Sequence, residues 1–257
     1  QIAVIELSGV IESSKDVIDH LYKQIKNPRV RGIVLRIESP GGAVGPSQEI
    51  NEAVSRLKEI KPIVASMGSV AASGGLYAAL GASKIFAQPG TLTGSIGVIL
   101  QVPNLRRVTE KLGVEMLTIK SGKFKDAGNA FREMTEDERA FLQSTVDEVN
   151  AEFVNAIVTG RGLDRSEVEK FADGRVLLGS NAVTLKLVDK IGGVYEAARE
   201  VFEILEKPLG PKEQPEIFYV EDKFARFRKF VEGLLDLPLS LRESVQGRQV
   251  ELRYIMY

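Results

Sequence analysis

The chain has 257 residues, 44% of them hydrophobic, and a formal net charge of −1, which is typical of an ordinary soluble globular protein. Its 34 basic and 35 acidic side chains create no net field that would attract nucleic acid or an anionic membrane. It has no Cys and a single His, so disulfides, thiolate nucleophiles and Cys-ligated metals are excluded, and any His-based triad would have to use His20.

Short apolar runs alternate with segments of helical periodicity, the pattern of an α/β fold with largely parallel strands. The chain opens without a Met on a strand-like run, Gln1–Leu7, as expected of a mature form cut just before its first strand. The sequence contains no run of about 18 apolar residues, so it predicts no transmembrane span. The predicted strands are Ile2–Glu6, Gly32–Ile37, Ile63–Ser66, Lys84–Ala87 and Ser95–Ile99, with Glu115–Ile119 extended. The predicted helices are Ser14–Lys26, Pro46–Glu59, Ala72–Leu80, Asn104–Leu112, Thr135 to about Val158 with a capping box from Thr135 and Glu138, Ser166–Ala172, Asn181–Leu185 and Val194–Leu205.

The Pro- and Gly-rich stretch that begins at Lys207 marks a change of composition. We therefore expect a main domain over residues 1–206 and a C-terminal appendage over residues 207–257. The appendage is predicted to contain a strand (Ile217–Val220), a basic amphipathic helix (Lys223–Leu235) and an extended tail (Gln249–Tyr257).

Two Gly-rich turns follow predicted strands. Ser39-Pro40-Gly41-Gly42 is by itself most simply a Pro-Gly turn, but its backbone N–H groups could also face a developing oxyanion. Ser73 begins a helix between Gly and Ala residues, where a hydroxyl meets the unpaired N–H groups of the first turn. A plain Ser N-cap is the simpler explanation, yet the small neighbours suit a nucleophile on a tight strand-to-helix turn. Ser66 and Ser69 compete with Ser73 for that role.

Three lysines lie in the Gly-bounded segment from Lys120 to Gly128, which alone would indicate a solvated surface loop. A buried lysine can instead lose its proton near neutral pH and act as a base. A Ser hydrolase without Cys and with a single His has few other bases, although Asp and Glu stay possible. His20 lies in the middle of the first predicted helix and is interpreted as a structural residue.

Together these segments resemble the signal peptide peptidase A family of membrane-associated Ser–Lys proteases. The resemblance runs from about Ile2 to Ala198. Its motifs are Ser39-Pro-Gly-Gly, Met67-Gly-Ser-Val-Ala-Ala-Ser-Gly-Gly, Thr91-Leu-Thr-Gly-Ser-Ile-Gly-Val, Ser121-Gly-Lys-Phe-Lys-Asp and Ala172-Asp-Gly-Arg-Val. The resemblance implies a crotonase-like or Clp-protease-like fold, a repeated β-β-α superhelix with parallel sheets flanked by helices.

By motif, the resemblance implies Ser73 as the nucleophile, Lys125 as the general base and Ser95 as a hydroxyl that orients the lysine amine. It assigns the oxyanion hole to the N–H groups of Gly42 and Gly74. The family usually has an aromatic residue directly after Ser-Gly-Gly. Here Leu76 stands at that position and Tyr77 follows, so we expect an altered substrate wall. We also expect Phe124 to help bury Lys125, and Asp126 to point outward so that its carboxylate does not face the lysine amine.

The family cleaves remnant signal peptides and other unstructured apolar segments through an acyl-enzyme and needs no metal or nucleotide cofactor. The resemblance further implies a homo-oligomer, by analogy an octamer, and no nucleic-acid partner. It places the protein at the cell membrane, attached by an N-terminal segment that this sequence lacks, with its catalytic domain in a soluble extracytoplasmic compartment. Two alternatives stay open: a crotonase-like enzyme that acts on acyl-CoA thioesters with a Glu-dependent site, and a catalytically inactive scaffold that binds apolar peptides.

The apolar tail Gln249–Tyr257 is hypothesised to pack close to the substrate groove of its own subunit or of a neighbour, because the family favours extended apolar peptides. An ordinary strand that closes the appendage is the alternative.

Overall fold

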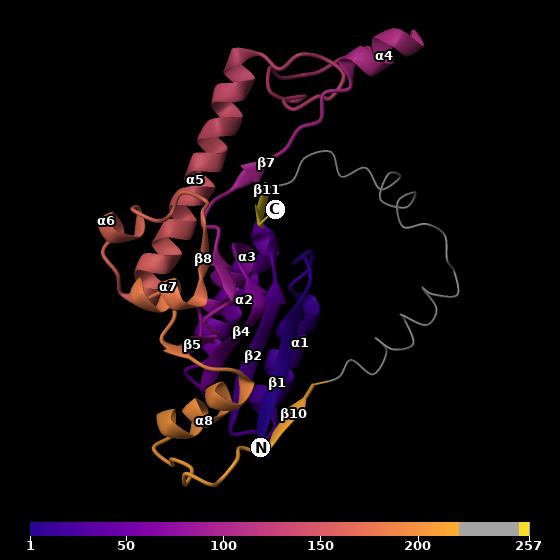
Figure 1. Cartoon of the computed structure of the whole chain (residues 1–257). Helices are drawn as coiled ribbons and strands as arrows, with labels where there is room; N and C mark the ends of the chain where they lie inside the picture. Colours follow the sequence, from indigo (N-terminus) through magenta and orange to yellow (C-terminus); the bar gives the residue numbers. More distant parts are fainter. Residues whose placement is uncertain (221–251, 257) are drawn as a thin grey trace.

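A mostly parallel β-sheet forms the centre of the molecule (Figure 1). The structure is a computed structural model that describes residues 1–220 and 252–256. Within these residues the sheet has the order β10-β1-β2-β4-β5-β9, and β6 and β8 extend it from β4. These strands are β1 (Ile2–Ser8), β2 (Gly32–Ser39), β4 (Ile63–Ala71), β5 (Lys84–Ala87), β6 (Leu92–Gly94), β8 (Val176–Leu178), β9 (Lys190–Ile191) and β10 (Ile217–Tyr219).

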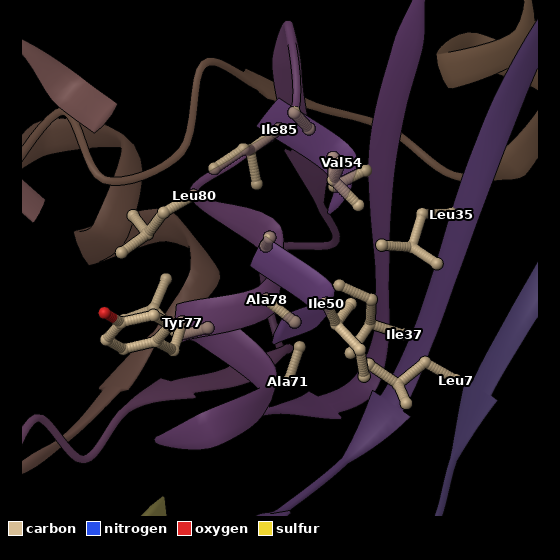
Figure 2. Close-up of a cluster of buried hydrophobic side chains, with 14 of the residues drawn as sticks. Leu7, Leu35, Ile37, Ile50, Val54, Ala71, Tyr77, Ala78, Leu80 and Ile85 are labelled. Atoms are coloured by element: carbon tan, nitrogen blue, oxygen red, sulfur yellow. The ribbon is translucent and has the colours of Figure 1, made fainter. Parts of the chain in front are cut away.

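Helices cover both faces of the sheet, which is why β1 and β2 each contain four consecutive buried residues instead of an alternating pattern. The helices are α1 (Lys15–Lys26), α2 (Val44–Leu57), α3 (Gly74–Ala79), α4 (Arg106–Leu112), α5 (Glu136–Arg161), α6 (Arg165–Val168), α7 (Gly179–Thr184) and α8 (Val194–Ile204). One face packs against α1, α2 and α3, and Figure 2 shows Leu35 and Ile37 of β2 meeting Ile50 and Val54 of α2. The other face packs against α8. The predicted α/β architecture, a parallel sheet flanked by helices, is confirmed.

A second, antiparallel sheet of three strands lies at one end of the first. It consists of β3 (Gly41–Ala43), β11 (Leu252–Ile255) and β7 (Ile99–Leu100), with β11 in the middle. The C-terminal strand thus joins two segments that are far away in the sequence. The predicted division at residue 206 stays a prediction; beyond it, β10 pairs in parallel with β1. The predicted amphipathic helix Lys223–Leu235 lies outside the described residues.

Between β7 and α5 the chain leaves the sheet and forms a projection, residues 101–134, here called the arm (Figure 1). The arm carries α4 and exposes large apolar side chains, including Leu117 at 90% and Ile119 at 92%. Helix α5 leads back from the arm, and it begins with the predicted capping box of Thr135 and Glu138, which is confirmed. Among the described residues, no helix combines the length and apolar character needed to cross a bilayer.

One predicted strand is wrong. The segment Ser95–Ile99 is not one strand: β6 ends at Gly94, and the next strand begins only at Ile99. Gly94 and Ser95 both have positive φ, 72° and 50°, which breaks an extended conformation. The extended segment Glu115–Ile119 pairs with no strand of the described chain and lies exposed in the arm.

Candidate active site

Ser73 lies on a strained turn between β4 and α3. It is the N-cap of α3, with φ 52° and ψ −115°, a backbone conformation that costs a non-Gly residue ~1–3 kcal/mol. Its residue surface is fully buried, and its Oγ has no hydrogen-bond partner. A capping serine would bond the first turn of its helix, and Ser73 makes no such bond. The hydroxyl is therefore held in place by the backbone and forms no hydrogen bond within the described chain.

The two competing serines lack the backbone turn of Ser73. Ser66 lies inside β4, and its hydroxyl accepts a hydrogen bond from the Arg36 guanidinium at 3.1 Å. Ser69 is exposed on the same strand. Neither lies on a positive-φ turn at the start of a helix, so the geometry favours Ser73 as the nucleophile.

Ser95 is brought beside Ser73 by backbone hydrogen bonds. The Ser73 N–H donates to the carbonyl of Gly94 at 2.8 Å, and the next residue is Ser95, which is 8% exposed. The Thr93 hydroxyl also donates to the carbonyl of Ala71 at 2.7 Å, which ties the two strand ends together. The two serines predicted to act together therefore lie on adjacent, mutually bonded turns.

The glycines predicted to form an oxyanion hole lie on facing segments. A Cβ added to Gly74 would lie 3.1 Å from the Gly42 nitrogen, and one added to Gly41 would lie 2.8 Å from the Gly74 nitrogen. Gly41 has a φ of 106°, so side chains are disfavoured there by both space and backbone conformation. Gly74 is the first residue of α3, where an N–H has no acceptor within the helix. The structure brings these amides together next to Ser73.

Glu38 is a site residue that the sequence analysis did not identify. Its carboxylate accepts hydrogen bonds from the backbone N–H groups of Ser69 at 2.9 Å and Val70 at 3.0 Å. These bonds hold the irregular end of β4, from which the turn to Ser73 starts. Its position directly before Ser39-Pro40-Gly41-Gly42 was the available signal, but only the tertiary structure shows what the carboxylate binds.

The strand β11 lies alongside the oxyanion glycines. It pairs antiparallel with β3 on one side, where Tyr254 faces Gly42, and with β7 on the other. The Met256 N–H donates to the Pro40 carbonyl at 2.8 Å, and bonded pairs alternate in an antiparallel ladder, so Gly42 and Tyr254 also form a bonded pair. The Tyr254 carbonyl is thus the acceptor that the Gly42 N–H faces. Residues 252–256 of the tail thus lie beside the glycines predicted to form the oxyanion hole, and the hypothesis that a substrate groove runs there stays a prediction.

The Tyr254 side chain fills an apolar pocket. It is fully buried, and its ring lies 5.2 Å from that of Tyr77 and 4.7 Å from that of Phe153 between centroids. Its hydroxyl donates to the Val149 carbonyl at 3.1 Å. Burial raises the pKa of Tyr254, so the phenol stays neutral. Tyr77, the residue after Leu76, is therefore part of the wall that this aromatic side chain contacts.

Lys125 does not meet Ser73 within the chain. It is exposed in the arm, and the Ser73 hydroxyl has no hydrogen-bond partner. The expected burial of Lys125 by Phe124 is not found, because the Phe124 ring is 41% exposed and packs on Phe141 and on the Lys123 ammonium. Of the predicted site residues, Ser73, Ser95, Gly42 and Gly74 come together in one chain and Lys125 lies apart.

The conformation of the lysine loop is set by an ionic cluster inside the arm. The Asp126 carboxylate accepts from the Arg132 guanidinium at 2.9 Å and from the Lys120 ammonium, and its side chain is 12% exposed, so it faces these two cations and does not point outward as expected. Arg132 also donates to Glu138 at 2.8 Å, at the start of α5. This bond is the main cause that lowers the pKa of Glu138 to about 2. Among the described residues, no group of three or more acidic or His side chains could hold a metal ion.

Comparison with known proteins agrees with this geometry. The model of peptidase family S49 matches residues 55–207. The protein slr0021 of Synechocystis sp., named as a candidate protease, is 38% identical over 98% of this chain and 92% of its own length. The chloroplastic serine protease SPPA of Arabidopsis thaliana is 30% identical over 96% of this chain, and Protease 4 of Haemophilus influenzae is 31% identical over 80%.

The chain covers 40% of the Arabidopsis protein and 35% of the Haemophilus protein, so it spans less than half the length of these two relatives. The matched family region contains Ser73, Ser95 and the arm. The match to a peptidase family with serine protease members favours a protease over the two alternatives, an enzyme that acts on acyl-CoA thioesters and a catalytically inactive scaffold that binds peptides. This chain belongs to peptidase family S49 and is a serine protease.

Proposed function

We propose that the protein is an endopeptidase with a Ser–Lys dyad that cleaves extended apolar peptides, including remnant signal peptides, through an acyl-enzyme. The observation that carries this proposal is the buried, unpaired Ser73 hydroxyl beside the Gly42 and Gly74 amides, with a β-strand already paired to Gly42. A substrate strand that takes the place of β11 between β3 and β7 would present its carbonyl to these amides and its apolar side chain to Tyr77 and Phe153.

In this mechanism the Ser73 Oγ attacks the scissile carbonyl and forms a bond to its carbon. A neutral Lys125 amine takes the hydroxyl proton and returns it to the leaving amine as the C–N bond breaks. The Gly42 and Gly74 N–H groups stabilise the oxyanion, and Ser95 orients the lysine amine. A water then attacks the acyl carbon while Lys125 takes a proton from it, and Lys125 returns this proton to the Ser73 Oγ as the ester C–O bond breaks and the new carboxyl product leaves.

The base is supplied by a second copy of the chain in this proposal. Lys125 is exposed in an arm whose apolar side chains, such as Leu117 and Ile119, have no cover within the described chain. Docking this arm onto a neighbour would bury those side chains and take the lysine out of water, which favours the neutral amine. A ring of such head-to-tail contacts is a closed homo-oligomer, and we propose an octamer. We also propose that the protein acts on its peptide substrates at the extracytoplasmic side of the cell membrane.

A serine-reactive fluorophosphonate tests the nucleophile. The phosphonate should label wild-type protein at Ser73, as located by peptide mass spectrometry. The variant Ser73→Ala should lose both labelling and turnover of an apolar peptide, whereas Ser69→Ala, on the exposed strand nearby, should keep both. Labelling that persists in Ser73→Ala, or turnover that depends on Ser66 or Ser69, would contradict the assignment.

A further inference from the structure

A cavity of about 520 Å³ lies next to the site, and of its lining residues the mechanism above uses only Ser95. Its walls come from the segment after Ser95, from one face of α5, and from residues 172–174 and 176. The α5 residues are spaced at three and four positions, so they share one face of the helix. The cavity is lined by polar groups that accept hydrogen bonds, among them Asp147, Asn150 and Asp173.

Two residues in the cavity wall keep unused capacity to accept hydrogen bonds. Asn150 lines the cavity, and its Oδ1 is buried without a hydrogen-bond partner, an arrangement that is costly for a polar atom removed from water. The Asp147 carboxylate accepts one hydrogen bond, from Gln143 at 2.8 Å, and can accept more. Asp173 is already paired, because it accepts hydrogen bonds from the backbone N–H and the guanidinium of Arg175. The described residues that line the cavity include no Lys, Arg or His.

The strand β11 shows which part of a substrate would reach the cavity. The Tyr254 carbonyl faces the Gly42 N–H, the position of a scissile carbonyl, and the two following residues, Ile255 and Met256, line the cavity. Both are apolar and neither side chain can donate a hydrogen bond to Asn150. A substrate in the same register would place the residues after its scissile bond here, on the leaving-group side.

We propose that this cavity is a specificity pocket for the leaving-group side of the substrate. It selects a cationic side chain, lysine or arginine, at the first or second residue after the scissile bond. The inference rests on the proposed function and deepens it, because it adds a polar requirement beside the apolar pocket that holds Tyr254. The combination predicts cleavage at borders where an apolar segment meets a basic residue.

Quenched fluorescent peptides test the pocket. Each peptide carries the same apolar residues ending in Tyr before the scissile bond, and Met, Lys or Glu at the first or second position after it. With the wild-type enzyme, kcat/KM for the better Lys peptide should exceed that for the Met peptide by about tenfold, with the Glu peptide the slowest. Equal rates for Lys and Met at both positions would overturn the inference.

Three variants test whether the preference arises in the cavity. Asn150→Leu should reduce the Lys-to-Met ratio to near one, and Asn150→Asp, which adds a carboxylate, should raise it. Asp147→Asn, at an exposed position, gives a second reading that does not depend on a buried substitution and should lower the ratio. The matched control Asn181→Leu, exposed on α7 and outside the cavity, should keep the wild-type ratio.

The outcomes separate this inference from the proposed function. If no peptide is cleaved in a Ser73-dependent manner, the proposed function fails. If all peptides are cleaved and Asn150→Leu slows them by the same factor, Asn150 serves the catalytic groups and not selection, and the inference fails. A change in the Lys-to-Met ratio, with Ser73-dependent cleavage of the Met peptide retained, supports it.

Discussion

The turn that carries Ser73 and the arm that carries Lys125 are opposite kinds of environment. Ser73 is fully buried, and its backbone is fixed by Gly94 and by the strand ends around it. Lys125 is exposed on a projection that also exposes Leu117 and Ile119. The proposed nucleophile is thus preorganised within one chain, whereas the proposed base needs removal from water that this chain alone does not provide. Catalysis in this protein should therefore depend on assembly.

The largest effect is expected from replacing the proposed base, Lys125. Lys125→Ala should lower kcat/KM for an apolar peptide by about 10³-fold or more, because proton transfer loses its base. Lys123→Ala, which removes an exposed ammonium paired with Asp137, is the matched control and should keep most of the activity. Equal losses from the two variants would mean that the loop acts through its charge.

Mixing two inactive variants tests whether the base comes from a second copy. Ser73→Ala and Lys125→Ala protein, unfolded or dissociated together and reassembled, should recover roughly a quarter of wild-type activity, since random mixing joins an intact serine and an intact lysine at one interface in four. Recovery should appear only in the oligomeric fraction of a sizing column. Mixtures that stay inactive, although the variants co-assemble, would exclude a dyad shared between copies.

A smaller loss is expected at the second serine. Ser95→Ala should reduce kcat by roughly tenfold to a hundredfold, since one orienting hydrogen bond contributes ~1–3 kcal/mol. The loss should fall on kcat more than on KM, because the Ser95 hydroxyl orients the base. A loss as complete as that of Ser73→Ala would give Ser95 a direct chemical role.

Removing β11 should raise kcat/KM, whereas the variants above should lower it. Deleting residues 249–257 should raise kcat/KM for short peptides by about threefold or more, because an occupied groove lowers apparent affinity by the fraction of molecules that are open. Tyr254→Ala should give a smaller gain and also a lower Tm, since it empties the pocket beside Tyr77 and Phe153. Unchanged assembly and unchanged kinetics after the deletion would remove β11 from the groove's function.

The smallest effect is expected on the Tm, from the bond between Arg132 in the arm and Glu138 at the start of α5. The pKa of Glu138 falls from its ordinary 4.5 to about 2, mainly through its bond from Arg132. A lowered carboxyl pKa adds stability above pH 4.5, and this contribution is lost as pH falls from there toward 2. The Tm difference between wild type and Glu138→Gln should therefore shrink between pH 6 and pH 3. A constant difference over that range would show that the carboxylate charge is not what stabilises this end of α5.

The sequence predicted best where short-range chemistry is sufficient. Apolar runs and helical periodicity located β1, β2, α1 and α8, and the Thr135–Glu138 capping box located the start of α5, because these signals act between residues close in the chain. They failed at Ser95, where a positive φ follows from a tertiary hydrogen bond between its N–H and the Arg175 carbonyl. No local pattern contains that partner.

The amino-acid sequence was thus enough to identify the motifs and the α/β class, which depend on residue type and spacing, and the family resemblance of those motifs supplied the candidate residues Ser73, Lys125 and Ser95. Tertiary structure alone decided that Glu38 holds the end of β4 and that Tyr254 lies against Gly42. It also separated Ser73 from Lys125. These relations join residues distant in the chain, and they are set by strand register and by the burial of apolar surface, which short-range propensities do not encode.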